Sequence, residues 1–169
     1  MPTHYKGSAK AVRALNAHIN LERAANTVAA QLTAQLDPQG LTISQFGTLE
    51  ALYHLGPLCQ NEIAQKLLRS GGNMTLVINN LEKQGWVRRV RQGNDRRLIR
   101  VHLTPKGRRE IARVIPGHVN AIIKTMSPLT ARDQEDLRRI CRKFGRGSAT
   151  NSRNTFSERG NKHDSNSTK

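Results

Sequence analysis

Apolar residues recur at helical spacing along most of the chain, which predicts a mainly helical protein. The pattern favours a long helix over residues 8–36, closed by the turn sequence of residues 37–40. A second helix is expected over residues 44–55, and a short strand over residues 58–60. The sequence therefore predicts two helices before the short strand.

The middle of the chain carries two short helical patterns on either side of a glycine turn. The first covers about residues 61–68, the second covers about residues 73–84, and residues 69–72 join them. The second has an apolar stripe at positions i, i+3, i+4 and i+7, formed by Met74, Val77, Ile78 and Leu81. Gly85 is the expected left-handed stop. This layout predicts a helix-turn-helix over about residues 61–84.

A β-hairpin is predicted next, over about residues 86–104. Its strands are residues 86–91 and 98–103, and residues 93–95 supply the turn. Along the second strand, apolar and polar side chains alternate as one buried and one solvent face require: Ile99, Arg100, Val101, His102 and Leu103.

The C-terminal part returns to helical spacing. Thr104 followed by Pro105 is a favourable helix start, and Pro116-Gly117 is expected to kink or break that fifth helix. A sixth helix is expected from about Thr130. Residues 147–169 are so rich in serine, asparagine, threonine and basic residues that a disordered basic and polar tail is predicted.

The net charge of the chain indicates what kind of partner it binds. The chain has 28 Lys+Arg against 12 Asp+Glu, a net charge of +16, and the basic excess is concentrated over residues 59–114. A basic excess over a helix-turn-helix indicates a polyanion partner. No apolar run approaches the roughly 18 to 20 residues that span a bilayer, and no secretory signal is recognisable. Two distant cysteines, Cys59 and Cys141, fit a reduced, cytoplasmic setting.

Other chemistries lack their motifs. The six histidines and two cysteines show no metal-ligand spacing, so no metal or other cofactor is expected. The sequence has no phosphate loop, nucleophile elbow or H-E-x-x-H motif. We therefore expect that the protein is not an enzyme.

The candidate site is a surface for double-stranded DNA. In a helix-turn-helix, the second helix enters the major groove by its N-terminal end, where free N–H groups attract phosphate. The turn and the outward face of that helix give these candidate DNA contacts: Arg69, Ser70, Gly72, Asn73, Thr75, Leu76 and Asn79. Arg69 is placed for a phosphate or a guanine, Thr75 and Leu76 for a thymine methyl, and Asn79 for an adenine edge or a phosphate.

The tip of the hairpin is the second candidate contact, formed by Asn94, Asp95, Arg96 and Arg97. Arginine on a projecting tip suits the narrow, negative minor groove of A/T-rich DNA. Asp95 is expected to orient an arginine through a paired ionic contact. The alternative is an ordinary solvated turn.

These residues resemble the MarR family of winged-helix regulators. The matching string is M-T-x-x-I-x-x-L-E-K-x-G-W-V-x-R, then D-R-R and V-x-L-T-x-x-G, from Met74 to Gly107. The resemblance covers about residues 10–146, although Trp86 stands where an aliphatic residue is usual. It implies a mainly α fold with a small β hairpin: a winged helix-turn-helix domain plus N- and C-terminal dimerisation helices at about residues 8–36 and 105–146.

The resemblance implies a homodimer, and the apolar stripes of the terminal helices support one independently. A two-fold dimer would place its reading helices about 34 Å apart, on a pseudo-palindromic operator. We expect a sequence-specific transcriptional regulator, acting as a ligand-responsive repressor. The alternative is an architectural protein that binds DNA without sequence preference.

Family members often sense phenolic compounds, quinones or oxidants. The residues that could line such a pocket are His18, Phe46, Tyr53 and His54. Ordinary packing is the favoured alternative for all four. Thiol sensing through Cys59 or Cys141 is also open, since arginines and a lysine flank Cys141 and supply the positive charge that a reactive thiol needs.

Overall fold

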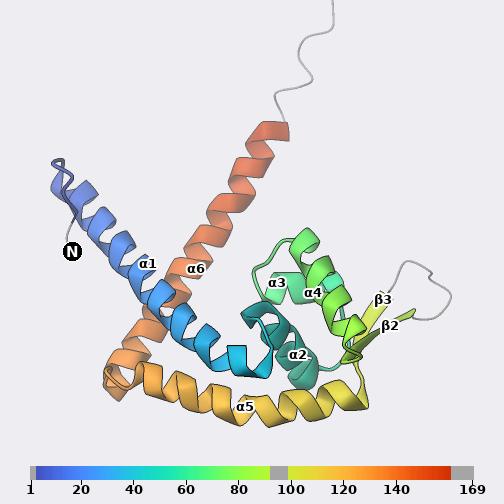
Figure 1. Ribbon diagram of the computed structural model, residues 1–169. Coiled ribbons are helices and arrows are strands. Elements are labelled where there is room, and N and C mark those ends of the chain that lie inside the picture. The colour runs from blue at the N-terminus through green and yellow to red at the C-terminus, as the bar shows by residue number, and fades with distance from the viewer. Residues whose placement is uncertain (1–2, 92–98, 161–169) are drawn as a thin grey trace, which may run out of the picture. The chain divides into compact units, whose positions relative to one another are not determined.

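The computed structural model of the chain describes residues 3–91 and 99–160 (Figure 1). The chain divides into two compact units, Met1–Thr125 and Met126–Lys169. In the described residues, no helix is both long enough and apolar enough to span a membrane.

The first unit begins with two capped helices. Helix α1 spans Ala9–Leu36, a 3₁₀ turn spans Asp37–Gln39, and α2 spans Ile43–Leu55. At the start of α2, the Thr42 hydroxyl accepts from the Gln45 backbone N–H at 3.2 Å, and the Gln45 side chain accepts from the Thr42 N–H at 2.9 Å. This capping box satisfies two N–H groups that the helix itself cannot.

The helix-turn-helix follows as α3, Gln60–Lys66, and α4, Gly71–Lys83. The predicted stripe of α4 is confirmed: its four apolar residues are buried, three of them completely, at Met74, Ile78 and Leu81. They join the apolar residues of α2, Ile63 of α3 and Val101 in one core. Burying one face of α4 leaves the opposite face to solvent.

A three-stranded antiparallel sheet packs beside these helices, in the order β1-β3-β2. The strands are β1, Leu58–Cys59; β2, Val87–Arg91; and β3, Ile99–Leu103. The predicted alternation along β3 holds in part. Val101 is only 1% exposed, but Ile99 is 38% exposed, because it pairs with Arg91 at the outer end of the hairpin, beyond the reach of the core.

Helix α5 spans Pro105–Met126 without interruption. Of the kink or break predicted at Pro116-Gly117, the break does not occur, since the helix continues through both residues. Ile111 and Val114 before the proline and His118 after it are all buried, so packing holds the helix on both sides of the one backbone bond that proline removes. Three side-chain hydrogen bonds join α5 to the end of α1 and to the 3₁₀ turn that follows it: Thr125 to Gln31, His118 to Gln35 and Arg113 to Gln39.

The second unit contains α6, Ala131–Gly160. Its start is capped by Thr130 and Asp133, each of which accepts from the backbone N–H of the other at 3.0–3.2 Å. Hydrogen bonds from Thr130 hold the pKa of Asp133 below its ordinary value. The helix continues through residues 147–160, which belong to the segment that the sequence predicts to be a disordered tail. Residues 161–169 of the predicted tail lie outside the described residues.

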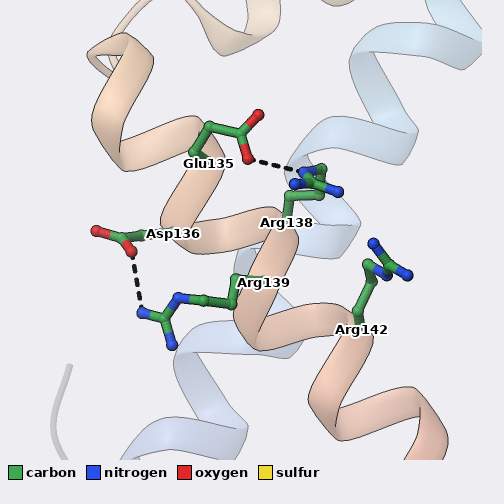
Figure 2. A pocket seen from close by; sticks show the side chains of 5 residues that line it. All are labelled: Glu135, Asp136, Arg138, Arg139 and Arg142. Atoms are coloured by element: carbon green, nitrogen blue, oxygen red, sulfur yellow. Dashed lines mark hydrogen bonds and ion pairs between the residues drawn. The ribbon is translucent and has the colours of Figure 1, made fainter.

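Two ion pairs run along α6, between Glu135 and Arg138 and between Asp136 and Arg139 (Figure 2). Together with Arg142 they line a surface depression of about 410 Å³. All four paired side chains are at least half exposed, so these pairs contribute little to stability.

The junction between β3 and α5 depends on Gly107. A Cβ on this residue would stand 2.0 Å from the carbonyl oxygen of Trp86, and no L side chain tolerates that approach to backbone. Thr104 holds the start of α5 close to Trp86. Its N–H donates to the same Trp86 oxygen at 3.0 Å, and its hydroxyl donates to the Gly85 carbonyl at 2.7 Å.

We predict that Gly107→Ala lowers the free energy of unfolding by about 2 kcal/mol or more, because the junction must move to admit the methyl group. Denaturant titration measures the change. Gly72→Ala is the matched control, since nothing lies within 4 Å of its Cβ position and alanine favours the helix. Equal stabilities of the two variants would contradict the role of Gly107.

Candidate nucleic-acid interface

The turn between α3 and α4 is closed by backbone hydrogen bonds. The Arg69 N–H donates to the Ala64 carbonyl at 2.9 Å, and the Leu68 N–H donates to the Gln65 carbonyl at 3.3 Å. This pair of bonds is a Schellman motif, which places Leu68 in the left-handed region at φ 50°. Leu68 is also 91% exposed. A strained, exposed leucine therefore stands where glycine is usual.

Helix α4 starts with open backbone N–H groups. Ser70 caps the helix, and its hydroxyl accepts from the Asn73 N–H at 3.4 Å. The first N–H groups of a helix have no acceptor within the helix, and here they belong to Gly71 and Gly72. Apart from the local helix backbone, no described heavy atom lies within 4 Å of a Cβ position on either glycine. An anion can therefore approach this helix end closely.

Gln60 at the start of α3 braces that opening. Its Nε2 donates to the Thr75 hydroxyl at 2.7 Å and lies 3.4 Å from the Gly71 carbonyl. The Thr75 hydroxyl in turn donates to the same carbonyl at 3.1 Å. Gln60 is absent from the sequence-predicted contacts, because nothing in its neighbourhood along the chain indicates that it reaches α4.

A shallow depression of about 360 Å³ lies over the same turn. Its lining residues come from α3, the turn and the first residue of α4: Asn61, Ala64, Gln65, Leu68, Arg69 and Gly71. Of the predicted contacts, Arg69 is among the lining residues and Ser70 follows it in the turn, and both are exposed. The turn thus offers a concave surface next to the open helix end.

The outward face of α4 carries the remaining predicted contacts. Asn73, Thr75, Leu76 and Asn79 are all exposed, and Leu76 is 61% exposed. This solvent face is the consequence of the buried stripe on the other side. The structure therefore groups on one surface the seven contacts that the sequence assigns to the turn and to this helix.

Arg89 of β2 ties the hairpin to α4. Its guanidinium pairs with the Glu82 carboxylate, and its backbone N–H donates to the same carboxylate at 2.9 Å. Its second guanidinium nitrogen donates to the side-chain amide oxygen of Asn79, Oδ1, at 2.7 Å. Glu82 and Arg89 belong to the family motif, but the sequence does not reveal that they meet. The orientation of the hairpin on the helix depends on this contact.

The predicted tip residues Asn94, Asp95, Arg96 and Arg97 lie outside the described residues. The strands that lead to them are described as far as the Arg91–Ile99 pair. Arg88 and Arg91 on β2 are exposed and basic. The minor-groove role of the tip stays a prediction.

The four candidate ligand residues do not form one group of contacts. Phe46 is buried in the core, with its ring 4.1 Å from the ring of His118. Tyr53 contacts His54 edge to face at 5.1 Å, and the Arg108 guanidinium lies over the Tyr53 ring. His18 is exposed on α1, 3.7 Å from Glu22. Packing accounts for Phe46 and in part for Tyr53, which is half-buried against the core, while His54 is exposed beside it on α2.

The fold and this surface define a winged helix-turn-helix DNA-binding protein. The sequence model of the MarR family matches residues 41–99. The transcriptional regulator YkoM of Bacillus subtilis is 32% identical over 79% of this chain and 86% of its own length. The transcriptional regulator MhqR of the same organism is 27% identical over 79% of this chain and 92% of its own length.

Solved structures agree. Sco3205, a MarR family regulator of Streptomyces coelicolor in complex with DNA, superposes with a TM-score of 0.74 at 27% identity, over 84% of this chain and 93% of its own. AbsC from the same organism reaches 0.75 at 21% identity, over 86% and 99%, which shows the fold alone. The chain belongs to the MarR family of transcriptional regulators and, as the sequence predicts, is not an enzyme.

We predict that Leu68→Gly raises the free energy of unfolding by roughly 0.5–1 kcal/mol, because glycine adopts a positive φ without strain. Leu68→Ala is the control, since it shortens the side chain and keeps the Cβ that causes the strain. Denaturant midpoints measure both. Equal gains in the two variants would mean that the side chain, not the backbone, is unfavourable.

The buried His118 gives a pH prediction. Burial lowers its pKa below the ordinary 6.5, and the charge of Glu50 opposes this only in part. The unfolded chain therefore binds a proton more readily, so stability is present above about pH 6.5 and is lost as the pH falls below it. Thermal unfolding from pH 7.5 to 5.5 should show this loss, and His118→Gln should reduce it. The exposed His54→Gln control should keep the full slope.

Proposed function

We propose that this protein is a sequence-specific transcriptional repressor that binds a pseudo-palindromic operator as a homodimer and responds to a small molecule. The observation that carries the proposal is the open start of α4, where Gly71 and Gly72 present free N–H groups beside a capped, braced turn. Such a helix end binds phosphate while the exposed face that follows reads base edges.

The relatives support the DNA-binding part. Sco3205 was solved in complex with DNA, and it matches 84% of this chain at 27% identity. The net charge of +16 supplies the electrostatic attraction that any DNA site requires. Arg89 anchors β2 on α4, and Arg96 and Arg97, which lie between β2 and β3 in the sequence, are the proposed second contact.

Exposed apolar side chains support the homodimer. On α5 they are Val119, Ile122 and Ile123, and on α6 they include Leu137 and Ile140, all between 37% and 62% exposed. Apolar surface of this kind on two long helices favours a partner, and a second copy of the chain is the partner that a two-fold operator requires. Each copy would then place one reading helix in each half-site.

The regulatory part rests on relatives and on one cluster. Transcriptional repressor MprA of Escherichia coli is 34% identical over 50% of this chain and 48% of its own length. Tyr53, His54 and Arg108 combine two rings with a cation at the surface of α2 and α5, which suits a phenolic or quinone effector. An oxidant acting at the exposed Cys141 is the second route. The cytoplasm is the compartment that fits such a regulator.

The decisive experiment is selection of operator sequences from random DNA, repeated with a panel of phenols, quinones and oxidants. We expect a two-fold motif with half-sites about one helical turn apart, and weaker binding with an active effector. The architectural alternative, favoured by the basic excess, predicts a steep salt dependence with no enriched sequence. Recovery of no motif at physiological salt would contradict the proposal.

We predict that Arg96→Ala and Arg97→Ala each weaken operator binding by about tenfold, because each removes a cation from the hairpin tip. Fluorescence anisotropy at physiological salt measures the affinity. Arg132→Ala on α6 removes the same charge from a residue outside the helix-turn-helix and the hairpin, and it should change binding much less. Wild-type affinity in both tip variants would exclude the tip as a DNA contact.

A further inference from the structure

The amide of Asn79 is held in one orientation. Its carbonyl oxygen accepts from the Arg89 guanidinium at 2.7 Å. A guanidinium only donates hydrogen bonds, so the oxygen, not the nitrogen, must face Arg89. Arg89 is itself held by two contacts to the Glu82 carboxylate, one from its side chain and one from its backbone. The exposed end of Asn79 is therefore its NH₂ group.

This orientation removes one way of reading DNA. An asparagine reads adenine with two bonds, accepting from the 6-amino group and donating to N7. Arg89 takes one of the two lone pairs of the Asn79 oxygen and holds this oxygen toward β2, so the donating half of the amide is the part that faces away from the protein. Its NH₂ group matches the acceptors of the major groove, namely purine N7, guanine O6 and thymine O4, or a phosphate oxygen.

Thr75 is restricted in the same way. Its hydroxyl proton goes to the Gly71 carbonyl, and its oxygen accepts from Gln60. With no proton left to donate to DNA, Thr75 offers its methyl group as the distinctive contact. In the protein without DNA, hydrogen bonds within the chain therefore already determine which groups Asn79 and Thr75 can offer to DNA.

We propose that Arg89 is a positioning residue for specificity: it makes Asn79 a donor-only contact, directed to an acceptor on the DNA, with the adenine 6-amino group unused. The inference rests on the proposed function and deepens it. It predicts that a half-site base facing Asn79 is chosen for its acceptors, and that cytosine, whose major-groove edge offers a donor, is disfavoured there.

The first test leaves Arg89 in place. Asn79→Asp keeps an oxygen for Arg89 and loses the donor, so it should weaken operator binding about tenfold or more, and Asn79→Ala should also weaken it. Wild-type affinity in both variants would overturn the proposal. A selection experiment with Asn79→Ala then identifies the base position, if any, whose preference depends on this residue. Loss of affinity without a changed base preference supports a phosphate as the acceptor.

The second test uses wild-type protein and modified DNA. At the identified position, adenine is replaced by purine 2′-deoxyriboside, which lacks the 6-amino group and keeps N7. We expect affinities within twofold of each other. A tenfold loss that appears with wild-type protein and disappears with Asn79→Ala would show the two-bond reading of adenine and overturn the proposal, while leaving sequence-specific binding intact.

The third test addresses Arg89. Arg89→Met keeps an apolar stem and frees the Asn79 oxygen, so the preference at that position should move toward adenine and become sensitive to loss of the 6-amino group. Arg88→Met, on the exposed side of the same strand, removes an equal charge and should lower affinity without that shift. A folded Arg89→Met with unchanged preference overturns the positioning role. If Arg89→Met does not fold, the first two tests decide the donor-only contact.

Failure of the proposed function has a different signature. If wild-type protein enriches no sequence, the protein is not a specific regulator, whatever Asn79 contacts. If it enriches a two-fold motif but fails the first or second test, the regulator stands and the donor-only reading is wrong.

Discussion

The arrangement of the reading surface depends on one backbone junction. The Trp86 carbonyl accepts from the Thr104 N–H, and Gly107 packs directly against it. This contact joins the end of α4 and the start of β2 to the end of β3 and the start of α5. Lys106 strengthens the same junction by donating to the Gln84 carbonyl at 2.9 Å, where a cation suits the C-terminal end of α4. The motif L-T-x-x-G is therefore a structural requirement, since any side chain at its last position would separate the two halves.

Stability and function are divided between the two faces of α4. The inner face supplies fully buried residues to the core, and the contacts of Gln60 and Arg89 hold the helix at its two ends. The outer face carries exposed residues, and the polar side chains of Thr75 and Asn79 on it already make hydrogen bonds within the protein. This division explains how a short helix can be held firmly in place while its first N–H groups stay open to an anion.

Periodicity predicted the helices, the strands and the buried stripe well, because each depends on residues close together in the chain. The features that the sequence did not predict depend on contacts between residues far apart in the chain. Gly85 was predicted as a left-handed stop, but Leu68 ends α3 by the same two bonds and has no glycine to reveal it. Pro116 signals a break that packing on both sides prevents. Gln60 reaches Thr75 fifteen positions further along the chain, and no local pattern encodes such a pairing.

The central claim is that DNA phosphate meets the open start of α4, and amide resonances test it most directly. The measurement is a ¹H–¹⁵N spectrum of the protein with and without its selected operator. Hydrogen bonding to phosphate should shift the Gly71 and Gly72 amides among the most strongly in the protein, while the amides of the buried stripe move little. Tight operator binding that leaves both glycine amides unchanged would contradict the account.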